Sequence, residues 1–301
     1  MPELGRARLR RYTTIVGGTK RGAPVRELVL ECVGVWKGFD RGRQWVSVLE
    51  DVSLTVAAGE IVAVVGTRDQ GKTTLVKVAA GIEQPDRGFV RVGGVELKGL
   101  KDRELARVLR TGIGLAGREG PRIRARMLEY VGLQLSAGRW LGGRKRRLCA
   151  AESLERLGVA ECADMRWGEL SDWQRVRVEL AQAIAPRPRL LLVDDLISGL
   201  GLGKTQEANQ LLRELANEIG CGVLMAVSDH ASAAPSDCVW QFDRHKLVLM
   251  ADHTSHQLPT IHHPRQALQA VQAGDRPDQD TWGRASRVRR RRGGSRESRK
   301  R

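Results

Sequence analysis

The feature that most constrains this sequence is a buried strand that runs directly into a glycine-bearing loop and then a helix. Residues 61–66, IVAVVG, have the apolar, β-branched character of a strand buried on both faces. The loop from Gly66 to Thr73, GTRDQGKT, fits the pattern G-x-x-x-x-G-K-[ST]. Backbone N–H groups of such a loop form an anion-binding concavity at the start of a helix, here predicted from Lys72 to about Ala80. The sequence therefore predicts a phosphate-binding loop.

The rest of the chain alternates between segments typical of strands and segments typical of helices. Strands are predicted over 28–35, 46–56, 189–194 and 222–228, with a strand pair over 89–97 and short strands near 237–250. Helices are predicted over 101–109, 174–185 and 204–218, together with a mostly helical insert over 121–168. Strands that alternate with helices imply an α/β fold with a mainly parallel sheet covered on both faces.

Positive charge is concentrated near the two ends of the sequence. The chain has 301 residues and a formal net charge of +16. Residues 1–27 contribute seven basic against two acidic residues and residues 284–301 ten against one, which leaves about +2 for 28–283. A nearly neutral central part does not require a nucleic-acid-binding surface. We expect a basic polar leader over 1–27, a folded part over 28–252 and a disordered basic tail over 253–301.

Cysteine usage and the lack of long apolar runs indicate a cytoplasmic protein. The five cysteines are widely spaced and form no C-x-x-C pair, which argues against a disulfide framework or a zinc site. No run approaches the ~18 apolar residues that cross a bilayer, and the basic N-terminus lacks the apolar stretch of a secretory signal. If the protein serves a membrane process, another chain crosses the membrane.

Three segments resemble the ATP-binding cassette (ABC) ATPases in their order along the chain. VLEDVSLTVAAGEIVAVVG precedes the phosphate loop, AGIEQPDRGFVRVGG follows it, and ELSDWQRVRVELAQAIAPRPRLLLVDD resembles the family's signature helix and second acidic motif. The resemblance, which runs from Leu28 to about Asp252, implies a P-loop fold with a mainly parallel core sheet, flanking helices, an antiparallel β subdomain and a helical subdomain at 121–168. It also implies a head-to-tail dimer with two ATP molecules at the interface.

The resemblance assigns roles around a bound nucleotide. The loop residues would hold ATP, namely Gly66, Thr67, Arg68, Asp69, Gln70, Gly71, Lys72, Thr73 and Thr74. Lys72 would reach the β- and γ-phosphates, while Thr73 and Asp194 would hold Mg²⁺. Phe39, or Trp36 nearby, would stack on adenine, although an ordinary core aromatic is the competing interpretation. Ser171 and Gln174, in the signature segment, would face the ATP of a partner chain.

Several positions depart from the family pattern at places that serve hydrolysis. Asp195 replaces the glutamate that polarises the attacking water, and its shorter side chain predicts slow turnover. Asp229 occupies the place of the switch histidine, and His230 follows one residue late, so Asp229 and His230 join Asp195 as candidate catalytic residues. Whether His230 replaces the histidine stays open, because a shift by one turns a strand residue to the opposite face. The signature L-S-G-G-Q is LSDWQ here, so both glycines are lost, and Asp172 would either cap the helix or oppose a partner's phosphate.

Three further departures concern the loop and the dimer interface. Asp69 replaces a glycine, as in the loops of elongation-factor GTPases, but no N-K-x-D guanine motif accompanies it. Arg118 replaces a glutamine that contacts magnesium and water, and we interpret it as a solvated loop cation. Gly201 replaces an interface aspartate.

Three functional hypotheses follow from the resemblance. The first is a cytoplasmic, peripheral ATP-binding subunit that powers separate membrane-spanning subunits of a transporter through dimer closure with a second ABC chain. LKDRELARVLRTGIG, residues 100–114, resembles the lipoprotein-release and macrolide-export branch. The second is a degenerate, regulatory ATP-binding partner of an intact ABC subunit. The third is a non-transport ABC protein whose basic tail, RVRRRRGGSRESRKR, contacts nucleic acid, although such tails also contact anionic lipid.

Overall fold

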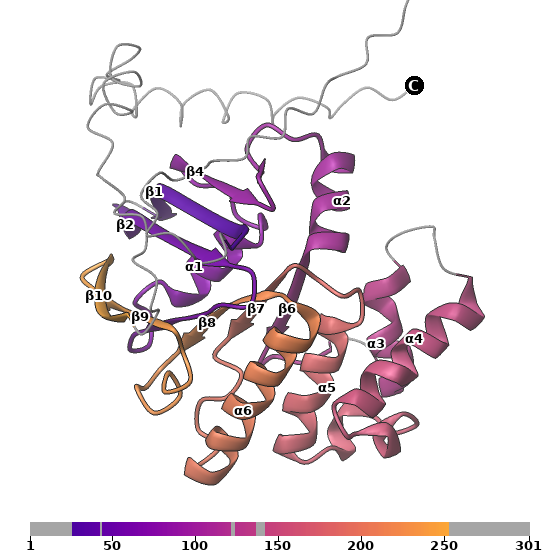
Figure 1. Cartoon of the computed structure of the whole chain (residues 1–301). Coiled ribbons are helices and arrows are strands. Elements are labelled where there is room, and N and C mark those ends of the chain that lie inside the picture. Colours follow the sequence, from indigo (N-terminus) through magenta and orange to yellow (C-terminus); the bar gives the residue numbers. More distant parts are fainter. Residues whose placement is uncertain (1–25, 43, 122–123, 137–141, 253–301) are drawn as a thin grey trace, which may run out of the picture. The chain divides into compact units, whose positions relative to one another are not determined.

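A computed structural model describes residues 26–42, 44–121, 124–136 and 142–252, and within these ranges the centre is a six-stranded sheet. The strand order is β10-β9-β3-β8-β7-β6. The strands are β3 (Ile61–Val65), β6 (Ile113–Gly117), β7 (Leu190–Asp194), β8 (Gly222–Val227), β9 (Cys238–Asp243) and β10 (Lys246–Asp252). Neighbours are parallel except β9 and β10, which form an antiparallel hairpin. The predicted mainly parallel core sheet is confirmed (Figure 1).

A second, antiparallel sheet has the order β2-β1-β4-β5. Its strands are β1 (Leu28–Arg41), β2 (Gln44–Ala57), β4 (Arg87–Val92) and β5 (Val95–Glu96). β1 and β2 form a hairpin that extends beyond the predicted strands 28–35 and 46–56, because the pairing continues to Arg41 and Gln44. This sheet is the antiparallel β subdomain that the resemblance implied.

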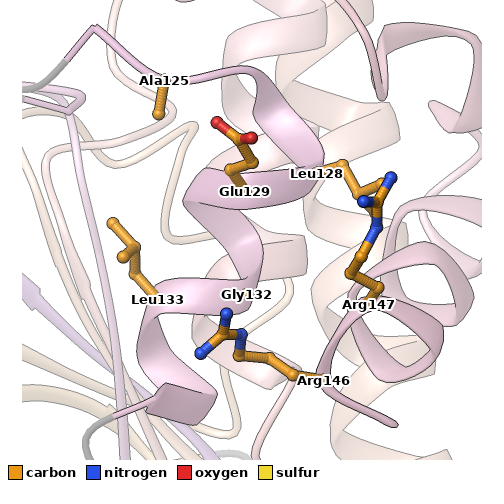
Figure 2. Close-up of a pocket in the computed structure, with 7 residues that line it drawn as sticks. All are labelled: Ala125, Leu128, Glu129, Gly132, Leu133, Arg146 and Arg147. Atoms are coloured by element: carbon orange, nitrogen blue, oxygen red, sulfur yellow. The ribbon is translucent and has the colours of Figure 1, made fainter. Parts of the chain in front are cut away.

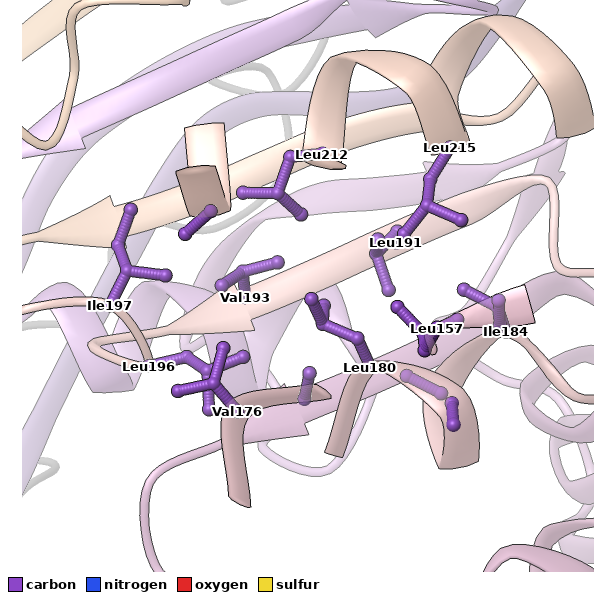
Figure 3. Packing of buried hydrophobic residues seen from close by; sticks show 14 of the residues in the cluster. Leu157, Val176, Leu180, Ile184, Leu191, Val193, Leu196, Ile197, Leu212 and Leu215 are labelled. Carbon is purple, nitrogen blue, oxygen red and sulfur yellow. The ribbon is translucent and has the colours of Figure 1, made fainter. Parts of the chain in front are cut away.

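Helices cover both faces of the core sheet. α1 (Lys72–Ala79) contacts β7 and β8 as well as the antiparallel sheet, so it lies between the two sheets. α5 (Asp172–Ile184) and α6 (Leu202–Ile219) contribute to one large cluster of buried apolar residues with the core strands. The spacing of Val176, Leu180 and Ile184 places them on one stripe of α5, as burial of a single helix face requires. Figure 3 shows this stripe close to Leu191 and Val193 of β7.

A helical subdomain lies between β6 and α5 in the sequence. It contains α3 (Met127–Ser136), α4 (Gly143–Arg156) and two short 3₁₀ turns, Ala160–Cys162 and Trp167–Glu169. α3 contacts both α4 and α5, and Leu154 of α4 is fully buried in the same apolar cluster as α5. The mostly helical insert predicted over 121–168 is confirmed for its described residues.

β6 is an element that the sequence pattern did not predict. It follows α2 (Asp102–Gly112) directly, and its sequence, IGLAG, contains two glycines and only one β-branched residue. A Cβ on Gly114 would lie 2.2 Å from the carbonyl oxygen of Ala183. Only glycine lets this strand pack so closely against α5. The residue that fits the strand to its neighbour therefore also weakens the strand signal in the sequence.

Two sequence-based expectations fall largely on residues outside the described ranges. They are the basic leader over 1–27, of which the structure describes only residues 26 and 27, and the disordered basic tail over 253–301. Among the described residues, no helix combines the length and apolar character needed to cross a membrane.

Candidate nucleotide-binding site

The phosphate loop leaves the carboxyl end of β3 and leads into α1. Gly66 N–H donates to the Val227 carbonyl of β8 at 3.1 Å, which ties the start of the loop to the neighbouring strand. Gly71 has φ +102°, and a Cβ there would lie 2.8 Å from the Val48 carbonyl oxygen. A side chain at this position would combine backbone strain with a clash, so the motif's second glycine is required by the fold. The strand, loop and helix context predicted for the motif is confirmed.

Asp69 adopts the left-handed backbone conformation, with φ +63°. Glycine enters this region without steric cost, and aspartate is one of the few other residues that tolerate it. The replacement of a glycine by Asp69 thus keeps the course of the loop. It places an exposed carboxylate beside the position predicted for phosphate.

The buried Lys72 side chain folds back onto the start of the phosphate loop. Its Nζ donates to the carbonyl oxygens of Gly66 at 2.5 Å and of Thr67 at 2.9 Å. Gln70 Oε1 accepts from the N–H of Thr67 at 2.7 Å, so this side chain also closes the loop on itself. These are the donors that the motif directs at phosphate. A bound phosphate would have to take over the contacts that Lys72 and the Thr67 N–H now make within the loop.

Thr73 and Asp194 meet across the site. Thr73 Oγ1 donates to Asp194 Oδ1 at 3.1 Å, although the two residues lie 121 positions apart in the sequence. Burial raises the pKa of Asp194, the hydrogen bond from Thr73 lowers it, and the charge of Asp195 raises it. A hydroxyl and a carboxylate are hard oxygen donors of the kind that Mg²⁺ binds through one or two protein groups plus phosphate. The donor set therefore fits magnesium.

Asp195 follows β7 with its backbone in the left-handed region, at φ +52°. Its N–H donates to the Ala226 carbonyl of β8 at 2.9 Å. Its Oδ1 accepts from Ser198 Oγ at 2.6 Å and from Ser228 Oγ at 2.8 Å. Main chain and side chain are thus both fixed at the edge of the sheet where β7 and β8 end.

Helix α5 begins at a reciprocal cap formed by Ser171 and Gln174. Ser171 Oγ accepts from the Gln174 N–H at 3.3 Å, and Gln174 Oε1 accepts from the Ser171 N–H at 3.0 Å. The alternative in which Asp172 caps the helix is wrong, because Asp172 is already in the first turn and pairs with Arg175 at 3.1 Å. The pattern S-x-x-Q satisfies two backbone donors at once, which a cap at Asp172 would not.

Trp173 occupies the place of the second lost glycine. Two cations make cation–π contacts with its ring. Arg177 Cζ, on the same helix, lies 4.8 Å from the ring centroid, and Lys204 Nζ, on α6, lies 5.3 Å from it. Cation–π attraction of this kind contributes about 0.5–1 kcal/mol at exposed sites. The tryptophan therefore joins the starts of α5 and α6, and it adds a large side chain to the turn that is predicted to face a partner.

The two candidate adenine-stacking residues lie on β1 and are both partly exposed. Lys37 Nζ lies 5.2 Å from the centroid of the Phe39 ring, and the Arg87 guanidinium lies 5.9 Å from that of Trp36. Neither ring is fully buried, so their exposure argues against a role only in the hydrophobic core. A stacking role for Phe39 stays a prediction.

Comparison with known proteins places the chain in a family. The family model described as "ABC transporter" matches residues 49–198. The lipoprotein-releasing system ATP-binding protein LolD of Cereibacter sphaeroides is 34% identical over 73% of this chain and 98% of its own length. The chain belongs to the ABC transporter ATP-binding family. This confirms the family resemblance on which the site assignments rest.

Two further matches to the ABC cassette show how far the likeness extends. The methionine import ATP-binding protein MetN 1 of Rhodococcus jostii is 34% identical over 65% of this chain, which spans only 58% of that relative's length. The solved dimeric structure of the bacterial ABC transporter cassette MJ0796 is 24% identical, covers 75% of this chain and all of the other, and has a TM-score of 0.68. At that identity the solved structure supports the fold alone.

In the ABC cassette, the two departing positions after β8 make no hydrogen bond to Asp195 within the part of the chain that the structure describes. Asp229 accepts from the N–H of Ser232 at 2.8 Å and from its hydroxyl at 3.0 Å, so its carboxylate closes the turn after β8. His230 is exposed. Catalytic roles for both stay predictions. The serine before them, Ser228, is the residue that reaches Asp195.

The remaining departures from the family pattern are exposed. Arg118 follows β6 with its side chain in solvent, and its Nη2 would lie 4.0 Å from a Cβ placed on Gly199. This matches its interpretation as a solvated cation. Gly201 precedes α6 with φ +79°, a backbone conformation that an aspartate would enter only with strain. The backbone at the start of α6 therefore favours glycine at this position, where the family pattern has an interface aspartate.

Sequence reasoning missed two serines that the fold brings to Asp195 and one glutamate that the fold buries. Ser198 and Ser228 hold Asp195, as described above. Glu179 lies beneath the end of β6 and is only 4% exposed. Its Oε1 accepts from the Tyr130 hydroxyl at 2.7 Å, and the Gly117 N–H also donates to the carboxylate. A single glutamate on the apolar face of a predicted helix was the available signal for this buried site.

A surface hollow of about 410 Å³ lies in the helical subdomain. Figure 2 shows Glu129 and Leu133 of α3 on one side and Arg146 and Arg147 of α4 on the other. Its lining is largely apolar apart from these charged groups, and it includes none of the phosphate-loop residues. The hollow is therefore separate from the nucleotide-binding site.

Proposed function

We propose that this ABC cassette binds ATP with Mg²⁺ and uses ATP binding and slow hydrolysis to drive separate membrane-spanning subunits of a transporter. The single observation that carries this proposal is the contact between Thr73 and Asp194 at the mouth of the phosphate loop. It joins the two oxygen donors expected of a magnesium site directly beside the lysine expected to bind phosphate.

Within this proposal each group has one task. Thr73 and Asp194 would hold the metal, which would neutralise phosphate charge when bound. Lys72 would exchange its two carbonyl partners for phosphate oxygens. Asp195 would accept a proton from the attacking water, as a carboxylate base does. Ser171 at the start of α5 would face the nucleotide of a second cassette.

Slow hydrolysis follows from the length of the Asp195 side chain. Aspartate is one methylene shorter than glutamate, and displacing a catalytic group by about 1 Å can lower a rate by about 100-fold. The two serine bonds further restrict how far the carboxylate can move. We therefore expect a turnover below about 10 s⁻¹, the median for enzymes.

ATP binding is tested by isothermal calorimetry of ATP with the full chain and with Lys72→Ala. We expect clear binding by the wild type and none by the variant. Lys77→Ala is the matched control, because Lys77 is an exposed lysine on the same helix. Unchanged affinity in Lys72→Ala would rule out the phosphate-loop assignment, and equal loss in both variants would indicate a general effect of charge.

The transporter role is tested by affinity purification of the chain from a native membrane fraction. Relatives of the cassette carry names of import, export and lipoprotein-release systems, so a polytopic membrane protein is the expected partner. Its recovery would support a peripheral subunit on the cytoplasmic face. Recovery of ribosomal or nucleic-acid components alone would contradict the proposal.

A second candidate function is that of a regulatory ATP-binding partner of an intact ABC subunit. The observation that favours it is the side chain of Trp173, which contacts Arg177 and Lys204 at a position where the family signature has a glycine. A crowded signature turn would serve a partner's ATP poorly, while the phosphate loop would still bind its own. Sedimentation with ATP distinguishes the two, since a homodimer supports the first function and a persistent monomer the second.

A further inference from the structure

Three polar side chains meet where two neighbouring parallel strands end. Asp195 follows β7, Ser198 lies in the turn three residues later, and Ser228 follows β8. Both serine hydroxyls donate to the same carboxylate oxygen, Oδ1, at 2.6 and 2.8 Å. The Ser228 N–H lies 3.4 Å from Ser198 Oγ, so the two serines also contact each other.

The two bonds use one carboxylate oxygen and leave the other for a different task. An sp² oxygen has two lone pairs in its plane, and two donors occupy both. Among the residues that the structure describes, none donates a hydrogen bond to Asp195 Oδ2. Because the Asp195 N–H is also fixed to Ala226 at 2.9 Å, both the main chain and the plane of the carboxylate are restrained.

We propose that Ser198 and Ser228 are positioning residues that hold Asp195 through Oδ1 and present Oδ2 as the base for the attacking water. The inference rests on the proposed function, because it needs Asp195 to act in ATP hydrolysis. The aspartate side chain is short and extends less far toward the attacking water than glutamate would. The rate of ATP hydrolysis therefore depends strongly on how well the Asp195 carboxylate is oriented. Ser228 thereby supplies from the end of β8 a contact that neither Asp229 nor His230 makes.

Ser228→Ala removes one donor, and it is the first variant because Ser228 is exposed and its truncation leaves no buried cavity. A hydrogen bond to a charged group corresponds to a rate change of about 10-fold or more. We expect kcat for ATP to fall by about 10-fold with KM within about twofold of the wild type. Ser228→Thr, which keeps the hydroxyl, should restore most of the rate.

A double-mutant cycle shows whether the serine acts through the carboxylate. In an Asp195→Ala background, Ser228→Ala should change the residual rate by less than about twofold, because the group it positions is gone. Ser198→Ala should behave in the same way. Ser153→Ala is the control, because that buried serine on α4 donates only to Cys149 of its own helix, and its kcat should equal that of the wild type.

Three results would overturn the positioning role of the serines, and a fourth would remove the proposed function on which that role rests. A wild-type kcat in Ser228→Ala, or an equal loss in the Asp195→Ala background, would overturn the positioning role. ATP binding with no turnover above that of Asp195→Ala would also overturn it, while the proposal of ATP binding would stand. Failure of the wild type to bind ATP in calorimetry would instead remove the proposed function.

Discussion

Glu179 provides a prediction whose size follows from its surroundings. The side chain is 4% exposed on α5, where it accepts hydrogen bonds from Tyr130 and from the Gly117 N–H. Burial raises the pKa of Glu179 from its ordinary value of 4.5 to about 7, although both hydrogen bonds lower it. The folded protein therefore holds a proton on Glu179 at pH values at which the unfolded chain has released it.

The sign and size of the pH dependence follow by linkage. Between pH 4.5 and about 7 the folded state binds more protons than the unfolded state, so stability decreases as the pH rises. The contribution is fully present below the unfolded pKa and is lost as the pH passes the folded one. At 1.36 kcal/mol for each pH unit, the part lost between pH 5.5 and 8 is about 2 kcal/mol.

The assay is urea unfolding of the wild type and of Glu179→Gln at pH 5.5, 6.5, 7.5 and 8. Glutamine keeps the shape and an oxygen acceptor but does not ionise. We expect the variant to gain about 2 kcal/mol relative to the wild type across this range. Glu155→Gln, at an exposed glutamate of α4, should follow the wild type. A constant difference between Glu179→Gln and the wild type would refute the reasoning.

Two further predictions concern the loop and the base. Gly71→Ala should destabilise the fold by about 1–3 kcal/mol, because the new Cβ would lie 2.8 Å from the Val48 carbonyl oxygen at a positive φ; an unchanged denaturation midpoint would contradict this. Asp195→Glu should raise kcat by up to about 100-fold if the reach of the carboxylate limits hydrolysis, and a lower kcat in a steady-state ATPase assay would count against Asp195 as the base.

The sequence predicted the parts of the site that depend on local pattern. The phosphate loop, α1 and Asp194 at the end of β7 each follow from a run of adjacent residues. Even the cap of α5 was available locally, because Ser171 and Gln174 have the spacing of a capping box. Asp172 is a competing candidate in the sequence because both serine and aspartate are good N-cap residues.

The sequence could not predict contacts that depend on how strands are ordered. Ser198 and Ser228 lie 30 positions apart and meet only because β7 and β8 are parallel neighbours. β6 was missed because Gly114, which the close approach of α5 requires, weakens the strand pattern. Glu179 has the pattern of an ordinary helical glutamate, because its partners come from two distant elements, Tyr130 from α3 and Gly117 from the end of β6.

The central claim is that Thr73, Asp194 and the phosphate loop form one site for ATP and magnesium. The most direct measurement is the affinity of the full chain for ATP by calorimetry, with excess Mg²⁺ and with EDTA, for the wild type and Thr73→Ala. We predict that Mg²⁺ strengthens ATP binding by the wild type and that Thr73→Ala abolishes most of this difference. An equal effect of Mg²⁺ on both proteins, or no ATP binding by the wild type in either buffer, would contradict the account.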